Sequence, residues 1–352
     1  MRCLVLGASG YVGRRLVPLL RQSGHEVRCL IRASSHARPT DGHPGVEIVT
    51  GDVLNLSDVR GALRGVDAVY HLVHALGRAD FPDRDRRAAH TVAEAAETAG
   101  VRRIVYLGGL QPSDPDSTTG GVSAHLASRA EVGQIFLHST VPAAVLRASI
   151  IIGSGSTSFE MLRYLTQRVP IIPLPSWARH HTQPIAIADV LHYLVRSLAL
   201  PDTLNRSFDI GGPDIVTYRQ LIQRCARAAR LPVPWSPPAP KLPGGLAAAL
   251  CGVLTPIPPR LAAPLIESLA HNMVCSEQDI TALLGEPDAG PTSLDQAITA
   301  ASRVHGTTVE LTNGSTSPAR TVAGDPPGAG GPQFVTEHTL SGNCDPDRLW
   351  EL

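Results

Sequence analysis

The chain has 352 residues, of which 43% are hydrophobic and 18% are charged, and its formal net charge is zero. This length and apolar content are enough to bury a large core, and we expect one main domain with appendages. The balanced charge shows no basic excess for nucleic-acid binding and no acidic block typical of a disordered tail. We therefore expect no nucleic-acid partner.

The six cysteines are scattered, without the Cys-x-x-Cys spacing of metal and redox sites. Cys3 and Cys29 fall inside expected strands, which is typical of buried thiols in a reducing compartment. Met1 leads directly into the first strand, which leaves no room for a signal peptide. The apolar run at 244–257 is shorter than the about 20 residues that span a bilayer. We expect a cytoplasmic protein without metal or transmembrane segment; peripheral membrane association and the oligomeric state stay open.

A strand expected at residues 2–6 runs into the glycine-rich segment GASGYVG at 7–13. Gly7 permits a tight exit from the strand, Gly10 lets backbone amides approach a pyrophosphate, and Gly13 lets the next helix lie close to the sheet. Phosphates would then meet a helix N-terminus, where free N–H groups and the helix dipole favour negative charge. An apolar-periodic helix and a second strand at 26–31 follow. The sequence therefore predicts a dinucleotide site.

Further strands are expected at 46–50, 68–73, 103–107 and 144–152, and they alternate with helices. The helix expected at 83–99 carries small residues at helical spacing, which allows close packing against a sheet. Another helix is expected at 123–138. This alternation predicts an α/β fold with a Rossmann-type, doubly wound parallel sheet.

After Gly153 the pattern loosens, and we assign helices at 159–168, 188–198 and 218–230 and a strand at 208–210 to a smaller C-terminal substrate lobe. The expected division is an NAD(P)-binding Rossmann domain at 1–303, with this lobe inserted mainly from 153–303. Residues 304–333 have the composition of a flexible linker. Residues 334–352 end one turn into a helix, so we expect them to be the start of a truncated further domain.

Four segments resemble the extended and atypical short-chain dehydrogenase/reductases: GASGYVG at 7–13, YHLVH at 70–74, LRASIIIG at 146–153 and QPIAIADV at 183–190. More narrowly, the chain resembles a bacterial NAD(P)-binding branch whose members carry a C-terminal START-like domain of unknown function. That domain would begin near Phe334. The resemblance covers about residues 1–300, and it also relates the chain to nitrogen metabolite repression regulators and to the accessory nucleotide-binding subunit of respiratory complex I.

The choice of cofactor depends on the charge after the second strand. NAD-preferring sites place a carboxylate there, whereas the 2′-phosphate of NADP favours arginine. Arg32 follows this strand, and no acid occurs before Asp41, so we expect NADP(H), with NAD as the alternative. The resemblance implies that Asp52 contacts the adenine; it could instead cap the next helix. The predicted cofactor-binding residues are Gly7, Ser9, Gly10, Tyr11, Val12, Gly13, Arg32, Asp52, Val53, Leu72 and Val73.

The catalytic pattern of the family is missing. Its members use a Tyr-x-x-x-Lys pair, in which lysine lowers the pKa of the tyrosine, but the one lysine of this chain is Lys241. The matching helix carries His125 and Arg129 at i and i+4. Histidine can act as a general acid near neutrality, and arginine can position the cofactor or an anionic substrate. We predict His125, Arg129 and His74 as the catalytic set; a merely polar helix face is the alternative.

Two classes of function remain open from the sequence. The first is an NADP-dependent oxidoreductase that lacks the Ser-Tyr-Lys triad and acts on a small apolar molecule. The second is a non-catalytic dinucleotide sensor, or a structural or regulatory binding protein. The missing triad favours the second class, whereas the retained polar residues of the cleft favour the first.

Overall fold

The computed structural model describes residues 1–33, 45–75, 78, 80–112, 122–168, 172, 176–237 and 259–306. The predicted truncated domain at 334–352 lies outside the described residues, as do Lys241 and the predicted linker from residue 307 onward. Helix α11 (Leu294–Gly306) includes the first three residues of that linker. No helix in the described part of the chain is long and apolar enough to cross a membrane.

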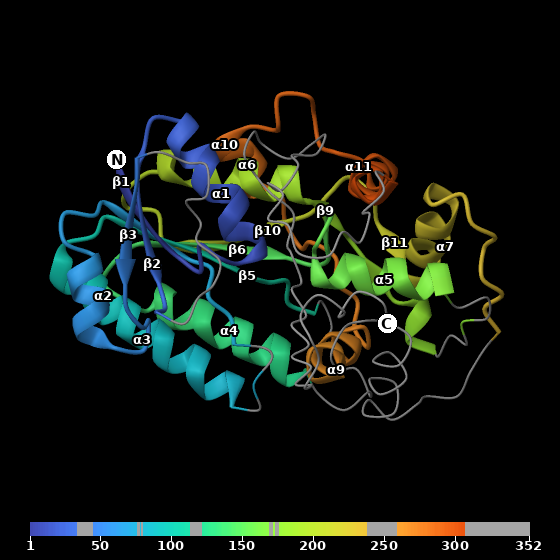
Figure 1. The fold of residues 1–352 in the computed structure, drawn as a ribbon, viewed down its shortest axis with the longest axis horizontal. Coiled ribbons are helices and arrows are strands. Elements are labelled where there is room, and N and C mark those ends of the chain that lie inside the picture. The colour runs from blue at the N-terminus through green and yellow to red at the C-terminus, as the bar shows by residue number, and fades with distance from the viewer. Residues whose placement is uncertain are drawn as a thin grey trace, which may run out of the picture.

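A seven-stranded sheet forms the centre of the molecule, with the strand order β10-β6-β5-β4-β1-β2-β3 (Figure 1). All of its neighbouring strands are parallel. The order runs outward from β1 in both directions, so the sheet is doubly wound and has a switch point beside β1, where a ligand crevice is expected. The predicted fold class is confirmed. The strands are β1 (Arg2–Leu6), β2 (Glu26–Ile31), β3 (Val46–Thr50), β4 (Ala68–His71), β5 (Arg103–Gly109), β6 (Ala143–Ala148) and β10 (Arg206–Ile210).

Helices cover both faces of this sheet (Figure 1). Helices α1 (Tyr11–Gln22) and α6 (Ile187–Arg196) share one apolar core with the strands. Helices α2 (Leu56–Ala62), α3 (Phe81–Ala99) and α4 (Ala124–Leu137) share a second core on the opposite face. The small residues predicted to pack against the sheet do so, since Ala89, Val92 and Ala96 are fully buried.

The strand expected at 144–152 is broken in the structure. Strand β6 ends at Ala148, and β7 (Ile151–Ile152) pairs with β9 (Ile185–Ala186) outside the main sheet. Between them the Ser149 hydroxyl donates to the carbonyl oxygen of Gln183, 2.5 Å away. The sequence does not reveal such a bend, because residues on both sides of it, Ala148 and Ile152, are buried.

The strand expected at 208–210 belongs to the main sheet and not to a smaller lobe. Strand β10 pairs with β6, and Phe208 and Ile210 join the core that α1 and α6 cover. The sequence could not show this, because a short apolar strand carries no signal of its partner. Outside the main sheet, four helices lie at one end of the molecule: α5 (Thr157–Arg168), α7 (Tyr218–Ala228), α9 (Pro259–Ser268) and α11 (Figure 1). The strand pair β8 (His181–Thr182) and β11 (Val216–Thr217) belongs to the same end. Helix α10 (Asp279–Leu284) instead contacts β10 and α6.

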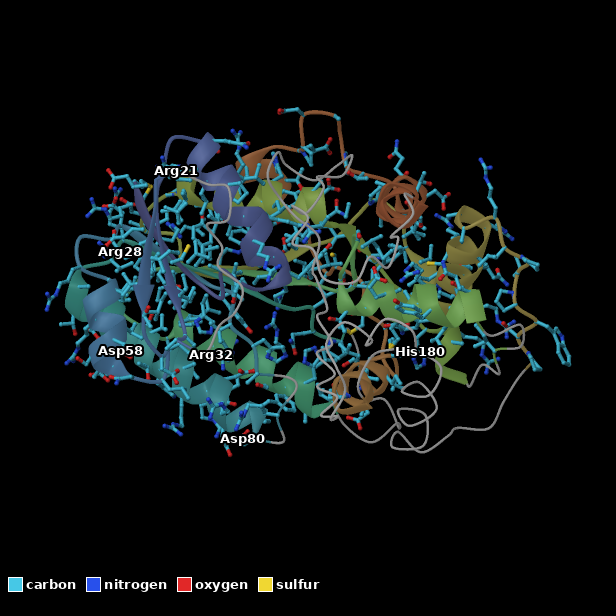
Figure 2. The ribbon with its side chains drawn as sticks, in the orientation of Figure 1. Arg21, Arg28, Arg32, Asp58, Asp80 and His180 are labelled. Carbon is cyan, nitrogen blue, oxygen red and sulfur yellow. The ribbon has the colours of Figure 1, made fainter. Side chains whose placement is uncertain are left out.

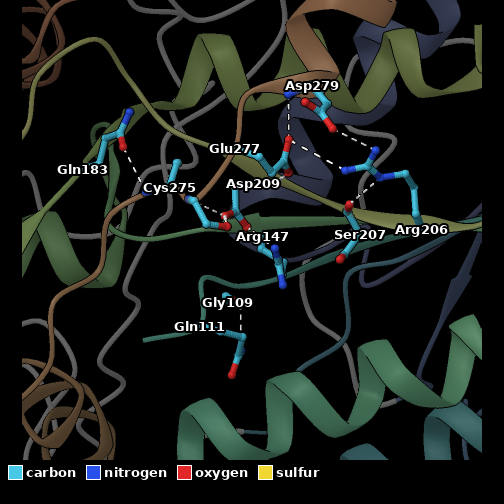
Figure 3. A network of polar contacts seen from close by, with 11 residues as sticks. Gly109, Gln111, Arg147, Gln183, Arg206, Ser207, Asp209, Cys275, Glu277 and Asp279 are labelled. Atoms are coloured by element: carbon cyan, nitrogen blue, oxygen red, sulfur yellow. Dashed lines mark hydrogen bonds and ion pairs between the residues drawn. The ribbon is translucent and has the colours of Figure 1, made fainter. Parts of the chain in front are cut away.

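A network of polar contacts links the edge of the sheet to the segment before α10 (Figure 3). Arg147 on β6 contacts Asp209 on β10, with 2.6 Å between guanidinium nitrogen and carboxylate oxygen. The other oxygen of Asp209 accepts hydrogen bonds from the backbone and hydroxyl of Ser276, at 2.8 and 2.7 Å. The carboxylate is buried, so its hydrogen bonds and its ion pair replace the lost hydration.

We expect Asp209→Ala to destabilise the fold, because the change leaves Arg147 without its carboxylate. Breaking a buried pair typically lowers the free energy of unfolding by about 3–5 kcal/mol. The Arg147 side chain keeps 24% exposure, so we expect the low end of that range. Asp202→Ala is the control: its pair with Arg102 is exposed, so the melting temperature should stay nearly constant. Thermal denaturation measures both, and equal effects would contradict the assignment.

Candidate functional site

The turn between β1 and α1 forms a backbone cradle. Gly7 has a φ of +85°, and the Gly10 amide donates to the Gly7 carbonyl at 2.9 Å. A Cβ atom on Gly13 would lie 2.3 Å from the Gly7 oxygen, so only glycine fits there. Gly10 is the N-cap of α1, and no side chain caps the helix. The first N–H groups of α1 are thus presented to a ligand, an arrangement that suits a pyrophosphate.

A cavity of about 500 Å³ opens beside this cradle, along the carboxyl ends of β1, β2 and β4. Its size is that of a small-molecule or cofactor site. Arg32, at the end of β2, is exposed and lines it (Figure 2). Of the predicted cofactor residues, the structure brings together Gly7, Ser9, Gly10, Arg32, Asp52, Val53, Leu72 and Val73 in the cavity wall, whereas Tyr11, Val12 and Gly13 lie in α1 outside it.

Asp52 does not cap the following helix. Its carboxylate accepts from the Leu54 amide at 3.0 Å and closes a tight local turn. The N-cap of α2 is Asn55, whose side chain accepts from the Ser57 amide at 2.9 Å. This excludes the capping role for Asp52 and leaves its side chain at the wall of the cavity.

Three side chains, Asp85, His74 and His125, form a hydrogen-bonded chain at one side of the cavity. His74 Nδ1 lies 2.5 Å from Asp85 Oδ2, and His74 Nε2 lies 3.2 Å from His125 Nδ1. Asp85 and His74 also line the cavity. His125 is on the first turn of α4, which Ser123 caps by accepting from the Leu126 amide at 3.3 Å. The structure thus joins two of the three predicted catalytic residues through a direct contact.

Burial disfavours the charged form of both imidazoles. It is the largest cause that lowers the pKa of His125, to about 3, and the charges of Arg129 and His74 act in the same direction. Burial also lowers the pKa of His74, against the raising effect of Asp85. A histidine with a lowered pKa in the folded state stabilises the fold above its ordinary pKa of about 6.5, and that contribution is lost as the pH falls toward the folded value.

Arg129 is held against strand β5. Its guanidinium donates to the Leu107 carbonyl oxygen at 2.5 Å and lies 5.3 Å from the centre of the Tyr106 ring. In this position its charge disfavours protonation of His125. A contact between Arg129 and a cofactor or an anionic substrate stays a prediction.

The sequence reasoning missed Asp85. This residue is 4% exposed and lies on the buried face of α3, three positions before Ala88. A charged residue in an otherwise small and apolar helical stripe was the signal that could have found it, since a carboxylate is rarely buried without a partner. The same logic would have pointed to His74 as that partner.

An apolar cluster lies beside His125. Leu110, Leu126 and Met273 are buried together, and Val122 and Cys275 pack against them. Leu126 follows His125 directly in the first turn of α4, so the cluster begins one residue after the predicted acid–base group. In addition, the Ser123 hydroxyl contacts that of Ser268 at 3.0 Å, which links α4 to α9.

The comparisons with known proteins agree with this site. Residues 7–149 match the NAD(P)H-binding family model. In this part the chain is similar to atypical short-chain dehydrogenase/reductases. It carries an NAD(P)-binding domain, while the START-like domain stays a prediction. The fold resembles that of the dTDP-glucose 4,6-dehydratase DesIV of Streptomyces venezuelae, with a TM-score of 0.63 and 18% identity over 86% of this chain and 96% of that one.

Three relatives show how far the similarity extends. The 3-beta-hydroxysteroid dehydrogenase of Mycolicibacterium neoaurum is 36% identical over 116 residues, which are 30% of this chain and 31% of that protein. The ceramide reductase of Caulobacter vibrioides is 30% identical over 49% of this chain and 53% of its own length. NADH dehydrogenase 1 alpha subcomplex subunit 9 of Mus musculus is 28% identical over 60% and 56%. The match thus spans about a third of the first relative and about half of the others.

We expect Gly13→Ala to disrupt the cradle, because the new Cβ would meet the Gly7 oxygen at 2.3 Å and the Ala8 Cα at 2.7 Å. Overpacking of this kind typically destabilises a protein by about 1–3 kcal/mol, and dinucleotide affinity should fall with it. Gly61→Ala is the matched control, because nothing lies within 4 Å of its Cβ position in α2. Calorimetric titration with NADPH and NADH measures the affinity; unchanged binding in Gly13→Ala would contradict a cradle at this turn.

Proposed function

We propose that the protein is an NADP-dependent oxidoreductase that interconverts an alcohol and a carbonyl group on an apolar molecule, with His125 as its acid–base residue. One observation carries the proposal: His125 is hydrogen-bonded to His74, which lines the dinucleotide cavity. An ionisable side chain on the helix that matches the family's catalytic helix therefore contacts a residue of the cavity wall. Bound in the cradle, the nicotinamide cofactor would supply or accept a hydride.

The residues of the chain would handle the proton that accompanies this hydride. A carbonyl that becomes an alcohol gains one proton on oxygen, and the reverse reaction releases it. His125 Nε2 has no hydrogen-bond partner among the described residues, so this nitrogen is available to a substrate oxygen. Arg129, bonded to the Leu107 carbonyl, would hold the turn of α4 in place.

Two features support the finer choices of cofactor and substrate. Arg32 lines the cavity, where a guanidinium suits a 2′-phosphate better than a ribose hydroxyl. The cluster of Leu110, Leu126 and Met273 beside His125 suits an apolar substrate. Two of the relatives are named for steroid and ceramide chemistry, which agrees with this choice.

The cytoplasm is the proposed location. The four cysteines in the described part of the chain are all free. Burial raises the pKa of the Cys3 and Cys29 thiols to about 12, so they stay protonated. Free buried thiols are typical of a reducing compartment.

We expect Arg32→Asp to shift the preference from NADP(H) toward NAD(H), because a carboxylate repels the 2′-phosphate that the guanidinium attracts. Hydrogen bonds to charged groups contribute about 1.5–3 kcal/mol, so the ratio of the two affinities should change at least about tenfold. Arg87→Asp, on the exposed face of α3 and outside the cavity, is the control. Calorimetry measures both dinucleotides, and equal affinities in the wild type would exclude the preference.

We expect His125→Ala to lower the turnover of NADPH with apolar ketones and aldehydes at least about tenfold, since positioned acid–base catalysis contributes about 100- to 10,000-fold. Dinucleotide affinity should stay within about threefold, because a group that acts in the transition state leaves ground-state binding intact. His138→Ala, at the exposed end of the same helix, is the control. Binding of the dinucleotide with no turnover in the wild type would instead favour the sensor function, in line with the similarity to the complex I subunit.

A further inference from the structure

We propose that Asp85, His74 and His125 form a directional proton relay that makes His125 Nε2 a base, so that the site is built to take a proton from the hydroxyl group of an alcohol. This inference rests on the proposed function and specifies the role of that site. Asp85 and His74 are positioning residues in it, because they act through His125.

The direction of the relay is set by the buried carboxylate. Asp85 Oδ1 accepts a hydrogen bond from the Ala75 amide at 2.9 Å, and Oδ2 faces His74 Nδ1 at 2.5 Å. An ionised carboxylate can only accept hydrogen bonds. Nδ1 of His74 must therefore carry the hydrogen in this contact.

The assignment then passes from one ring to the next. A neutral imidazole carries one N–H, so when Nδ1 of His74 is the donor its Nε2 is an acceptor. The contact of 3.2 Å between His74 Nε2 and His125 Nδ1 is then made by a hydrogen on His125 Nδ1. This leaves a lone pair on His125 Nε2, the nitrogen that a substrate would meet.

Proton uptake can occur without a charge remaining on His125. When His125 Nε2 takes the proton of the substrate hydroxyl group, the O–H bond of the alcohol breaks and an N–H bond forms on His125. The hydrogen on His125 Nδ1 then moves to His74 Nε2. The carbon that bears the hydroxyl group would give up its hydride, for which a bound nicotinamide cofactor is the acceptor. The result is a neutral His125 and a His74 imidazolium, which lies directly against the Asp85 carboxylate. The reverse sequence returns the proton to a carbonyl oxygen.

The surroundings favour this end point. Arg129 is a cation whose charge disfavours a proton on His125 and on His74. His71, at the end of β4, is fully buried, and burial lowers its pKa to about 3, so it stays neutral and adds no charge. The Phe81 ring of α3 packs nearly perpendicular to the His74 ring, with 6.1 Å between ring centres. Asp85 is thus the anion that can stabilise a positive charge within the relay.

The tautomers of the two histidines test the relay without any measurement of activity. In ¹⁵N NMR spectra a nitrogen that carries a proton and one that does not resonate in separate regions, and His74→Gln and His125→Gln identify the signals. At about pH 7.5 we expect both wild-type rings to carry hydrogen on Nδ1. In Asp85→Asn the new NH₂ group can donate to His74 Nδ1. Both rings should then carry their hydrogen on Nε2, which is the tautomer that cannot accept a proton from a substrate.

A wild-type His125 with its hydrogen on Nε2, or tautomers that Asp85→Asn leaves unchanged, would overturn the relay. Either result leaves the proposed oxidoreductase function standing if turnover is observed.

Kinetics test whether the relay is used. Asp85→Asn should lower the rate of alcohol oxidation with NADP⁺ at least about 100-fold, because His125 would present a donor where a base is needed. The plot of the oxidation rate against pH should also lose the fall at low pH that reports protonation of the relay in the wild type. Asp83→Asn, with a side chain 73% exposed on the same helix, is the control and should match the wild type. Full activity and an unchanged pH profile in Asp85→Asn would overturn the catalytic use of the relay. Absence of turnover in the wild type would overturn the proposed function itself.

Discussion

The turn between β1 and α1 is packed so closely that only glycine can form it, and the rest of the site depends on this constraint. A Cβ atom on Gly7 would lie 2.7 Å from the Leu72 carbonyl oxygen, so the turn rests directly on the chain that leaves β4. That chain continues to His74. The same backbone contact therefore presents the N-terminus of α1 to phosphates and places an ionisable side chain along the wall of the same cavity.

The site also depends on a partner for the buried charge of Asp85. Transfer of a carboxylate out of water is unfavourable unless it is paired and hydrogen-bonded. Asp85 meets this requirement through the Ala75 amide and His74, both of which follow β4 in the chain. The Arg147–Asp209 pair solves the same problem at the edge of the sheet, with Ser276 as the additional donor. The two networks differ in consequence, because only the first reaches the cavity.

Local patterns in the sequence were enough to predict the sheet, its glycine-rich turn and the helix that carries His125. These features depend on residues close together in the chain. The sequence did not show that β10 joins β6, because Ala148 and Arg206 are 58 positions apart and pairing depends on the whole fold. It also did not show the contact between His74 and His125, which are 51 positions apart and approach only because α4 packs beside β5.

In the proposed mechanism, Asp85, His74 and His125 take the place of the tyrosine and lysine that short-chain dehydrogenase/reductases use. Lysine assists tyrosine by its positive charge, whereas here a carboxylate supports a pair of neutral imidazoles. An arginine at the lysine position keeps a cation on the helix, yet Arg129 is turned toward the Leu107 carbonyl and disfavours protonation of His125. Such a site suits removal of a proton from an alcohol better than donation to a carbonyl.

A crystal structure of the protein with NADP⁺ bound would test the central claim most directly. We predict that the pyrophosphate lies on the N-terminus of α1 at Gly10, and that the nicotinamide ring lies within about 4 Å of the His74–His125 pair, the distance of a van der Waals contact. A nicotinamide ring directed away from these two side chains would contradict the account.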